Sequence, residues 1–347
     1  MATVLTASGS GERPIEPLRI AAAGLEHQHV EGLLWQARER GDLELVGVWE
    51  PDAELFASMA KQYGLDSQLR FDDLGAMLDA TRPEAVSVMT SIDAHLAVVE
   101  ACAPRGVHTL LEKPLAFELD DALAMAALAQ AHGVHVLTNY ETSWYASVRE
   151  AARLVATEAF APLRRMVFRH GHAGPIEIGC RPEFVEWLTD PARNGGGALV
   201  DFGCYGAVLA TWLMGGERPL EVIASATTLK PEHYAAVDDD ATIVLRYPTA
   251  TAVIQASSAW THDNKEVDLI AEGGSLHAGK WAALERRRPD GPREALDVPS
   301  LPPKLADEWT YLRHLVRGEC AVDPLSSLEL NLIAVEILDA AREQIAD

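Results

Sequence analysis

The sequence has few cysteines, few basic residues and no long apolar run. Its four cysteines, Cys102, Cys180, Cys204 and Cys320, lie far apart and form no C-x-x-C pair. This spacing favours reduced thiols over a zinc site or a disulfide framework. No segment approaches the ~20 apolar residues of a membrane span, and residues 1–17 lack the basic start and apolar run of a signal peptide. We therefore expect a soluble, cytoplasmic protein.

Positive charge is also scarce. The chain has 29 Lys and Arg against 52 Asp and Glu, which gives a formal net charge of −23. A surface that follows nucleic-acid phosphates or binds an anionic membrane needs an excess of Lys and Arg. We therefore expect no nucleic-acid partner and no membrane partner, and look instead to small molecules and other protein subunits.

What the chain does have is length, since 347 residues exceed what one hydrophobic core usually serves. From Leu18 onward, short β-branched runs alternate with helical patterns, many of them followed by glycine. Repeated strand, helix and strand units predict a doubly wound parallel sheet, a Rossmann domain, over residues 18–138, after a flexible segment at 1–17. The expected strands are Leu18–Ala23, Leu43–Trp49, Ala85–Met89, His108–Leu111 and His135–Thr138; the expected helices are Val30–Arg40, Asp52–Tyr63, one capped by Asp72, Asp93–Arg105 and Glu118–His132.

The pattern changes at residue 139. Runs such as EVIASATTL, ATIVLRYP, TAVIQASSAW and EVDLIAEGG follow one another with short spacers, which predicts a largely antiparallel sheet. Helices are expected at Ala198–Met214 and Ala306–Arg317. A last helix, Leu328–Ile345, is a candidate to pack back on the first domain. The fold class is α/β, with a C-terminal α+β domain at 139–347 that presents the substrate and forms oligomers.

The first strand-to-helix turn is where such sheets bind the diphosphate of a dinucleotide, but here it departs from G-x-G-x-x-G. Counting from Gly24, Glu26 and His29 replace the other two glycines. A carboxylate at Glu26 repels a diphosphate unless it points away, so the turn alone is more simply an ordinary connection. Support comes from Glu50 at the end of the second strand, which can bind ribose hydroxyls and would repel the extra phosphate of NADP. Glu50 favours NAD, although it also precedes a helix cap.

Three further segments carry a resemblance. Leu111–Leu115 contains E-K-P; Thr90–His95 is similar to T-P-N-x-x-H with Ser91 in place of proline; Gly195–Tyr205 is similar to G-G-G-x-x-x-D-x-G-x-H with Tyr205 as its last residue. Together they resemble the Gfo/Idh/MocA family, named for glucose-fructose oxidoreductase and inositol dehydrogenase. The order of elements fits from about Leu18 to the C-terminus.

The resemblance implies hydride transfer between a carbinol carbon and a nicotinamide. It assigns Tyr205 as general acid/base in place of the usual histidine, Lys113 as its electrostatic partner and substrate hydrogen-bond donor, and Asp201 as substrate orienter. Because Tyr and Lys are both protonated at pH 7, one of them must have its pKa lowered by neighbours. Other interpretations remain: Lys113 as a solvated lysine, Asp201 as a helix-start carboxylate, and Tyr205 as a core residue.

The turn and the resemblance together predict which residues bind cofactor and substrate. A basic residue that relatives often carry near residues 141–143 is missing, which indicates a neutral substrate. His27 and His29 suggest a metal, but no third ligand lies nearby in the sequence and we expect none. The expected cofactor-binding residues are Gly24, Leu25, Glu26, His27, Glu50, Thr90, Ser91, His95, Glu112 and Lys113; those for substrate are Tyr140, Trp144, Asp201 and Tyr205.

The sequence thus predicts an NAD(H)-dependent oxidoreductase acting on a sugar, cyclitol or similar polyol, with NAD preferred to NADP. One alternative is a family member that keeps its nicotinamide bound and uses it transiently, as glycosidases and aldose-aldose oxidoreductases of the family do. Another is a non-catalytic sensor of dinucleotide or sugar. An open sheet face in the second domain would leave apolar surface exposed in a monomer, so we expect a homodimer or homotetramer.

Overall fold

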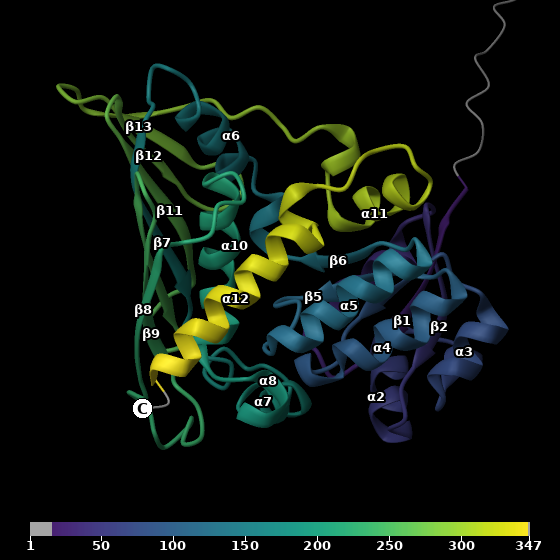
Figure 1. Ribbon diagram of the computed structural model, residues 1–347. Helices are drawn as coiled ribbons and strands as arrows, with labels where there is room; N and C mark the ends of the chain where they lie inside the picture. The colour runs from purple at the N-terminus through teal and green to yellow at the C-terminus, as the bar shows by residue number, and fades with distance from the viewer. Residues whose placement is uncertain (1–15, 346–347) are drawn as a thin grey trace, which may run out of the picture.

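The computed structural model describes residues 16–345, so most of the N-terminal segment expected to be flexible lies outside the described residues. Two sheets stand side by side, with helices packed between and around them (Figure 1). The first contains six strands and the second eight. This arrangement confirms the predicted combination of a parallel and a mostly antiparallel sheet.

The first sheet is parallel throughout, with strand order β3-β2-β1-β4-β5-β6. The order reverses between β1 and β4, which creates the crevice where open α/β sheets bind their ligands. Both faces of β4 are buried, as expected for a strand with helices on each side. The strands are β1 (Leu18–Ala23), β2 (Leu43–Trp49), β3 (Arg70–Phe71), β4 (Ala85–Val88), β5 (His108–Glu112) and β6 (Val136–Asn139).

The helices of the first domain begin and end at the expected kinds of residue. The Asp52 carboxylate accepts the backbone N–H groups of residues 54 and 55, and Gly64 ends the same helix in the left-handed conformation. The third helix is capped by Asp73 and not by Asp72, because only the Asp73 carboxylate reaches the amide of Ala76. The helices are α1 (Val30–Glu39), α2 (Ala53–Tyr63), α3 (Leu74–Thr81), α4 (His95–Cys102) and α5 (Leu119–His132), with 3₁₀ turns at Ser67–Leu69, Ile92–Ala94 and Ala103–Arg105.

The second sheet has the order β14-β13-β12-β11-β7-β10-β9-β8. Its first strand in the chain, β7, lies at the centre, where it runs parallel to β10 and antiparallel to β11. All other neighbouring strands are antiparallel. The strands are β7 (Leu163–Gly171), β8 (Glu221–Thr227), β9 (Asp240–Arg246), β10 (Thr251–Ser257), β11 (Asn264–Ala271), β12 (Gly274–Ala278), β13 (Leu284–Arg287) and β14 (Arg293–Ala295).

Helices cover only the inner face of this sheet. The helix expected at 198–214 divides at Phe202 into α9 (Ala198–Asp201) and α10 (Gly203–Leu213). Gly203 lets α10 start close to its neighbours, since a Cβ there would lie 3.2 Å from Ile243 and 3.5 Å from Leu338. The remaining elements are α6 (Ala146–Val155), α7 (Pro182–Leu188), α8 (Pro191–Asn194), α11 (Glu308–Val316) and α12 (Leu328–Ile345), with 3₁₀ turns at Glu141–Trp144, Pro303–Leu305 and Pro324–Ser326.

Two C-terminal helices reach the first domain. Helix α12 runs between the sheets (Figure 1), and Arg342 on it donates to the carbonyl of Phe117 at 2.6 Å. Helix α11 belongs to the core of the first domain, where Trp309, Leu312 and Leu315 are buried beside β1 and α1 residues. The second half of the chain therefore contributes to both cores.

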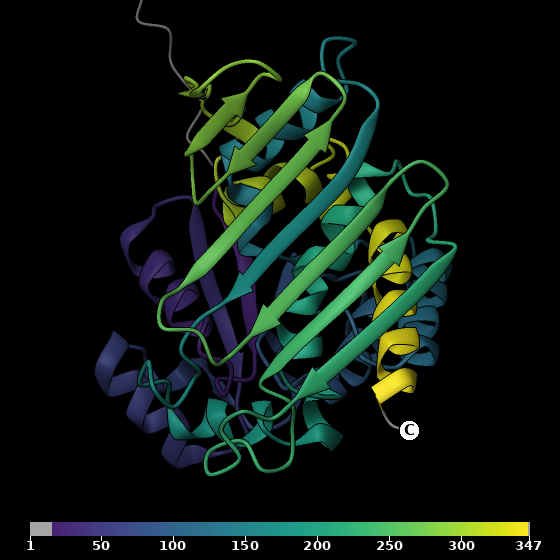
Figure 2. The ribbon, with the colours of Figure 1, turned by 90° about the vertical axis from the view of Figure 1, so that its left-hand side faces the viewer.

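The outer face of the eight-stranded sheet carries no helix (Figure 2). Side chains alternate along each strand, so the even-numbered residues of β8 turn inward and Ile223 turns outward. Within residues 16–345 no single helix is long and apolar enough to cross a membrane. The segments Pro191–Asp201 and Gly203–Leu213 pass that test only as a pair bent by 58°, and α10 is largely buried in the second core.

Gly206 sits where α10 crosses β10. A Cβ at this position would lie 2.6 Å from Cγ2 of Ile254, so Gly206→Ala must push helix and sheet apart. We expect a loss of about 1–3 kcal/mol in the free energy of unfolding, measured by denaturant titration. Gly32→Ala on α1 is the matched control, because its Cβ meets nothing within 4 Å. That change should stabilise by about 0.5–1 kcal/mol. Equal effects from the two substitutions would contradict the packing described.

Candidate active site

A cavity of about 490 Å³ opens between the two domains, beyond the carboxyl ends of β1 and β5. It contains all three residues expected to be catalytic, together with others that the sequence did not indicate. Its lining residues are His27, Gln28, His29, Lys113, His172, Ala173, Ile178, Cys180, Phe184, Leu188, Asp201, Phe202, Tyr205, Thr261, His262, Asp263 and Lys265.

The turn after β1 is tight and depends on Gly24. Gly24 has φ +84°, and a Cβ there would lie 2.9 Å from the side chain of Thr90 and 3.0 Å from the carbonyl of Met89. Only glycine fits both the conformation and the space. The turn therefore lies directly against the end of β4, at the crevice of the sheet.

Glu50 braces this turn from the end of β2. One carboxylate oxygen accepts the backbone N–H of Leu25 and the other that of Asp52, each at 2.9 Å. Burial raises the pKa of Glu50, against the lowering effect of these two amide bonds. Each oxygen keeps a further lone pair, so bracing the turn still permits hydrogen bonds from a ligand.

Glu26 points into the crevice and is held there by two donors. Its carboxylate accepts the backbone N–H of Ser91 at 2.9 Å and the guanidinium of Arg193 at 2.8 Å. Arg193 lies on α8, so this ion pair crosses from the second domain to the turn. Arg181 makes a second crossing, because it donates to the carbonyl of Leu25 at 2.8 Å.

A second cavity, of about 420 Å³, lies on the other side of the turn, between β2, β4 and α7. Acidic residues outnumber basic ones around this cavity, so it disfavours a ligand that carries a further negatively charged group, such as an extra phosphate. Its charged lining residues are Glu26, Glu50, Asp52, Asp93, Glu183, Glu186 and Arg193.

Lys113 and Asp201 form a buried ion pair across the domain junction. The Lys113 ammonium donates to the carboxylate of Asp201 and, at 3.1 Å, to its backbone carbonyl. Burial by itself lowers the pKa of Lys113, but the negative charge of Asp201 outweighs burial and leaves the pKa raised. Lys113 is therefore a charged hydrogen-bond donor at neutral pH.

Tyr205 lies beside this pair. The ammonium of Lys113 is 5.5 Å from the centre of the Tyr205 ring and that of Lys265 is 5.7 Å away, so the ring lies between two cations. Burial, followed by nearby negative charges that include Glu141, raises the pKa of Tyr205 well above 10. The lowering of pKa that a general base requires is thus not supplied by these side chains.

Lys265 is a site residue that sequence reasoning missed. It is the second residue of β11 and lies opposite His170 on β7, and the alternation of both strands turns the two side chains inward. Lys265 pairs with Glu141 at 2.7 Å, while both ring nitrogens of the fully buried His170 lack a hydrogen-bond partner. A lysine at an inward position of an apolar alternating strand was the available signal.

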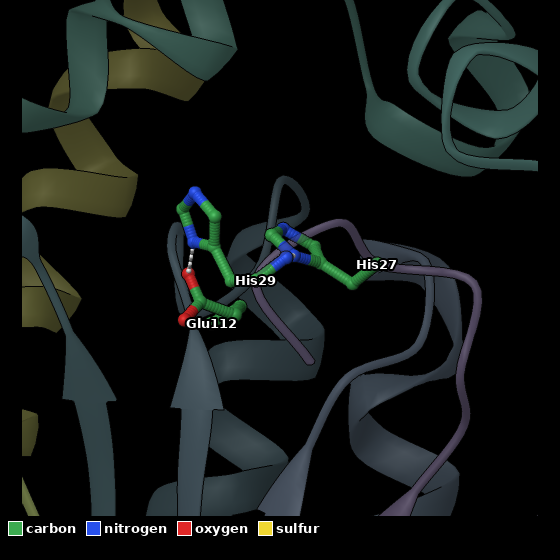
Figure 3. A group of neighbouring side chains, drawn as sticks. All are labelled: His27, His29 and Glu112. Carbon is green, nitrogen blue, oxygen red and sulfur yellow. Dashed lines mark hydrogen bonds and ion pairs between the residues drawn. The ribbon is translucent and has the colours of Figure 1, made fainter. Parts of the chain in front are cut away.

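His27, His29 and Glu112 meet at the mouth of the cavity (Figure 3). Nδ1 of His29 lies 3.0 Å from a Glu112 carboxylate oxygen, and Nδ1 of His27 accepts the backbone N–H of His29 at 3.1 Å. Glu112, the third potential ligand that the local sequence did not offer, arrives from β5. The fold thus collects a His-His-carboxylate group that the spacing of residues does not reveal.

Some expected residues lie elsewhere. His95 is fully buried, with Nδ1 on the carbonyl of Leu115, so it braces the E-K-P segment without facing either cavity. Tyr140 is 1% exposed and packs edge-on against Tyr205, 5.4 Å between ring centres. Trp144 packs against Tyr311 in the first core. We expected both aromatic residues to contact the substrate. Neither lines the cavity, because both follow the end of β6 and are buried in the interior.

Comparisons with known proteins identify the family of the chain. Residues 18–140 match the model of an oxidoreductase family with an NAD-binding Rossmann fold, and residues 148–277 match the GFO/IDH/MocA C-terminal domain. The D-apiose dehydrogenase of Paraburkholderia graminis is 27% identical over 274 residues, covering 76% of this chain and 68% of the relative. The NADP-dependent D-xylose 1-dehydrogenase of Haloarcula marismortui is 23% identical over 337 residues, covering 94% and 91%.

Among solved structures, an inositol dehydrogenase homologue from Azotobacter vinelandii in complex with NAD+ superposes with a TM-score of 0.81 at 20% identity, over 97% of each chain. This likeness concerns the fold. The chain is an oxidoreductase built on a dinucleotide-binding Rossmann domain. It belongs to the Gfo/Idh/MocA family.

The crevice fits a dinucleotide on one condition. The amide of Ser91 and the guanidinium of Arg193 converge on an anion, at the turn and helix start where a diphosphate binds in this fold. In the structure that anion is the protein's own Glu26. A diphosphate can take the same two donors when the Glu26 side chain turns away, and the carboxylate of Glu50 remains available to the ribose.

Replacing Glu26 by glutamine removes the charge that competes with a diphosphate. We expect Glu26→Gln to bind NAD about 5- to 30-fold more tightly in calorimetric titration, because one repulsion of about 1–2 kcal/mol is removed. Glu39→Gln, at the far end of α1, changes net charge equally and should leave the affinity within about twofold. Weaker binding by Glu26→Gln would show that Glu26 supports the cofactor and does not compete with it.

Proposed function

We propose that the protein is a cytoplasmic, NAD(H)-dependent dehydrogenase of a neutral sugar, cyclitol or similar polyol. The observation that carries the proposal is the Lys113–Asp201 ion pair beside Tyr205, in one cavity with the dinucleotide turn. Two groups that hold protons thus lie next to the place where the Rossmann fold delivers a nicotinamide. The four cysteines are unpaired, which suits a reducing compartment.

The charges of the cavity support a neutral substrate. Among the described lining residues each lysine already has an acidic partner: Asp201 pairs with Lys113, and Glu141 pairs with Lys265. A substrate carboxylate would find no uncompensated lysine there. Polar groups remain for hydroxyl recognition, among them Asp263 and His172. The named relatives act on D-apiose and D-xylose, which are neutral sugars.

Three side chains perform the chemistry in this proposal. When bound, the nicotinamide accepts or returns the hydride at the carbinol carbon. Lys113 and the Tyr205 hydroxyl donate hydrogen bonds to the reacting oxygen, and Asp201 fixes Lys113 and orients the substrate. Because the pKa of Tyr205 is raised, its hydroxyl stays protonated and can donate a hydrogen bond to the reacting oxygen.

The preference for NAD over NADP rests on the smaller cavity. A 2′-phosphate would lie among Glu50, Asp52 and the two glutamates of α7, with Arg193 as the only basic residue among those that line the cavity. Glu50 lines this cavity at the end of β2. This acidic surround also makes nucleic acid an unsuitable partner.

The decisive assay is reduction of NAD by a panel of neutral polyols, followed at 340 nm. We expect turnover with NAD at least tenfold above NADP, and no turnover with aldonic acids. Lys113→Ala and Tyr205→Phe should each lower kcat by about 10²- to 10⁴-fold while NAD affinity stays within threefold. Tyr63→Phe and Lys304→Ala, outside both cavities, are the matched controls. A fully active Tyr205→Phe enzyme would refute the assigned role.

We also propose that a second copy covers the open face of the eight-stranded sheet. Ile223 on β8 and Ile270 on β11 are 51% and 42% exposed there. Light scattering at micromolar concentration should show a dimer or tetramer, and Ile223→Arg with Ile270→Arg should reduce its mass. Trp35→Arg, an exposed aromatic on α1, is the control. A monomeric wild-type protein would count against this interface.

A further inference from the structure

The side chain of Glu112 is oriented by two hydrogen-bond donors, one on each carboxylate oxygen. One carboxylate oxygen accepts the side-chain amide of Asn139 at 3.2 Å, and the other lies 3.0 Å from Nδ1 of His29 (Figure 3). Asn139 is itself oriented, because its carbonyl oxygen accepts the indole N–H of Trp144 at 3.0 Å. Glu112 is only 2% exposed, so its charge acts on its buried neighbours, chiefly His29, His27 and Lys113.

This arrangement sets the tautomer of His29. A carboxylate can only accept, so Nδ1 of His29 must carry the proton of the hydrogen bond. In the neutral ring the lone pair is then on Nε2, the nitrogen that points away from Glu112. His29 lines the cavity with a side chain that is 50% exposed, whereas His27 is 1% exposed and packs 5.0 Å from the Phe184 ring. His29 therefore offers a basic nitrogen to the cavity.

The reaction needs such a nitrogen. Oxidation of a carbinol releases the hydroxyl proton, yet Lys113 is held as an ammonium by Asp201 and the buried Tyr205 keeps its own proton. His172, which lines the same cavity, uses its Nδ1 to accept the amide of Gly174 at 2.9 Å, and burial lowers its pKa. His29 alone among these groups combines exposure to the cavity with a carboxylate partner.

We propose that His29, oriented by Glu112, accepts the proton released when the substrate is oxidised. The inference rests on the proposed dehydrogenase function and extends it. In the balanced step the C–H bond gives its hydrogen with both electrons to the cofactor, the O–H proton goes to Nε2 of His29 directly or through one water, and a C=O bond forms. The imidazolium then passes its proton to solvent. Glu112 acts through His29 and is a positioning residue.

The surrounding charges determine how pH acts on this step. Burial lowers the pKa of His29, but the charge and hydrogen bond of Glu112 outweigh burial and raise the pKa above 6.5, while Lys113 and Lys265 oppose the increase. His27 on the same turn and Glu308 on α11 also face the ring. Because the acceptor must be neutral, oxidation should accelerate as pH rises through this pKa.

The same three side chains could instead hold a metal ion. Their ligand atoms lie within 4.8 Å of one another, and two histidines with a carboxylate suit a transition metal. The hydrogen bonds favour the proton-accepting role, because Nδ1 of His27 and Nδ1 of His29 both already have partners within the protein. A tightly bound metal is therefore the outcome that would overturn the proposal.

The kinetic test compares His29→Gln and Glu112→Gln with His277→Gln. His277 pairs with Asp268 at 2.8 Å on the outer face of the sheet, so it is a histidine–carboxylate pair outside both cavities. We expect His29→Gln to lower kcat for oxidation about 100-fold with KM for NAD within threefold, and to abolish the rise of kcat with pH. Glu112→Gln should shift that rise to lower pH, and His277→Gln should change neither. An unchanged pH profile in His29→Gln refutes the role.

A second test does not depend on turnover and separates this inference from the dehydrogenase function. In a sample with ¹⁵N-labelled histidine, the signal lost in His29→Gln should show a neutral ring protonated at Nδ1, with a pKa above 6.5. A ring protonated at Nε2 would overturn the proposal even in an active enzyme. Stoichiometric metal in the purified protein, lost together with activity on chelation, would overturn it as well.

Discussion

The ion pair between Lys113 and Asp201 is the interaction on which the arrangement of the two domains depends. Each charge is nearly buried, so each requires the other, and removal of one partner would leave an uncompensated charge at a cost of about 3–5 kcal/mol. Lys113 follows β5 of the first sheet and Asp201 ends α9 under the second. The pair therefore fixes one relative position of the domains, and the cavity is what remains open between them.

Other ion pairs also join the two domains along their junction. Arg193 pairs with Glu26, Arg181 with Glu31, and Arg342 with Glu118, and each pair joins the second half of the chain to the first. In each case the arginine comes from the C-terminal part. Carboxylates of the first domain therefore bind arginines of the second. Part of the excess of acidic residues in this chain thus stabilises the contact between the two domains.

Much of the fold could be predicted because it is encoded locally. Period-two and helical patterns, together with caps such as Asp52 and glycine stops such as Gly64, predicted five of the six strands and most helices of the first domain within one or two residues. The short strand β3 was not predicted, because its two residues show no alternation. Helix α12 agrees with its predicted bounds. Lys113, Asp201 and Tyr205 could be proposed as catalytic residues because each lies in a short local motif of the sequence. The structure brings the three residues into one cavity.

The rest depends on contacts between distant segments. The sequence near Glu112 does not predict its contact with His29, because that contact forms only when β5 lies beside the turn after β1. In the same way, the contact between Glu26 and Arg193 forms only when α8 packs against this turn. The break at Phe202 adjoins Gly203, which packs against Ile243 and Leu338 from distant segments of the chain. The alternation of β11 turns Lys265 inward, but its position opposite His170 depends on the register of β11 against β7, which a single strand cannot reveal.

The central position of β7 also constrains how the chain reaches this structure. During synthesis β7 leaves the ribosome first among the eight strands, yet Met166 on it pairs with Ala252 of β10 and Leu269 of β11, which are made much later. Both edges of this apolar strand stay unpaired for that interval, and unpaired edges invite aggregation. The second sheet can therefore complete itself only after β10 and β11 have emerged.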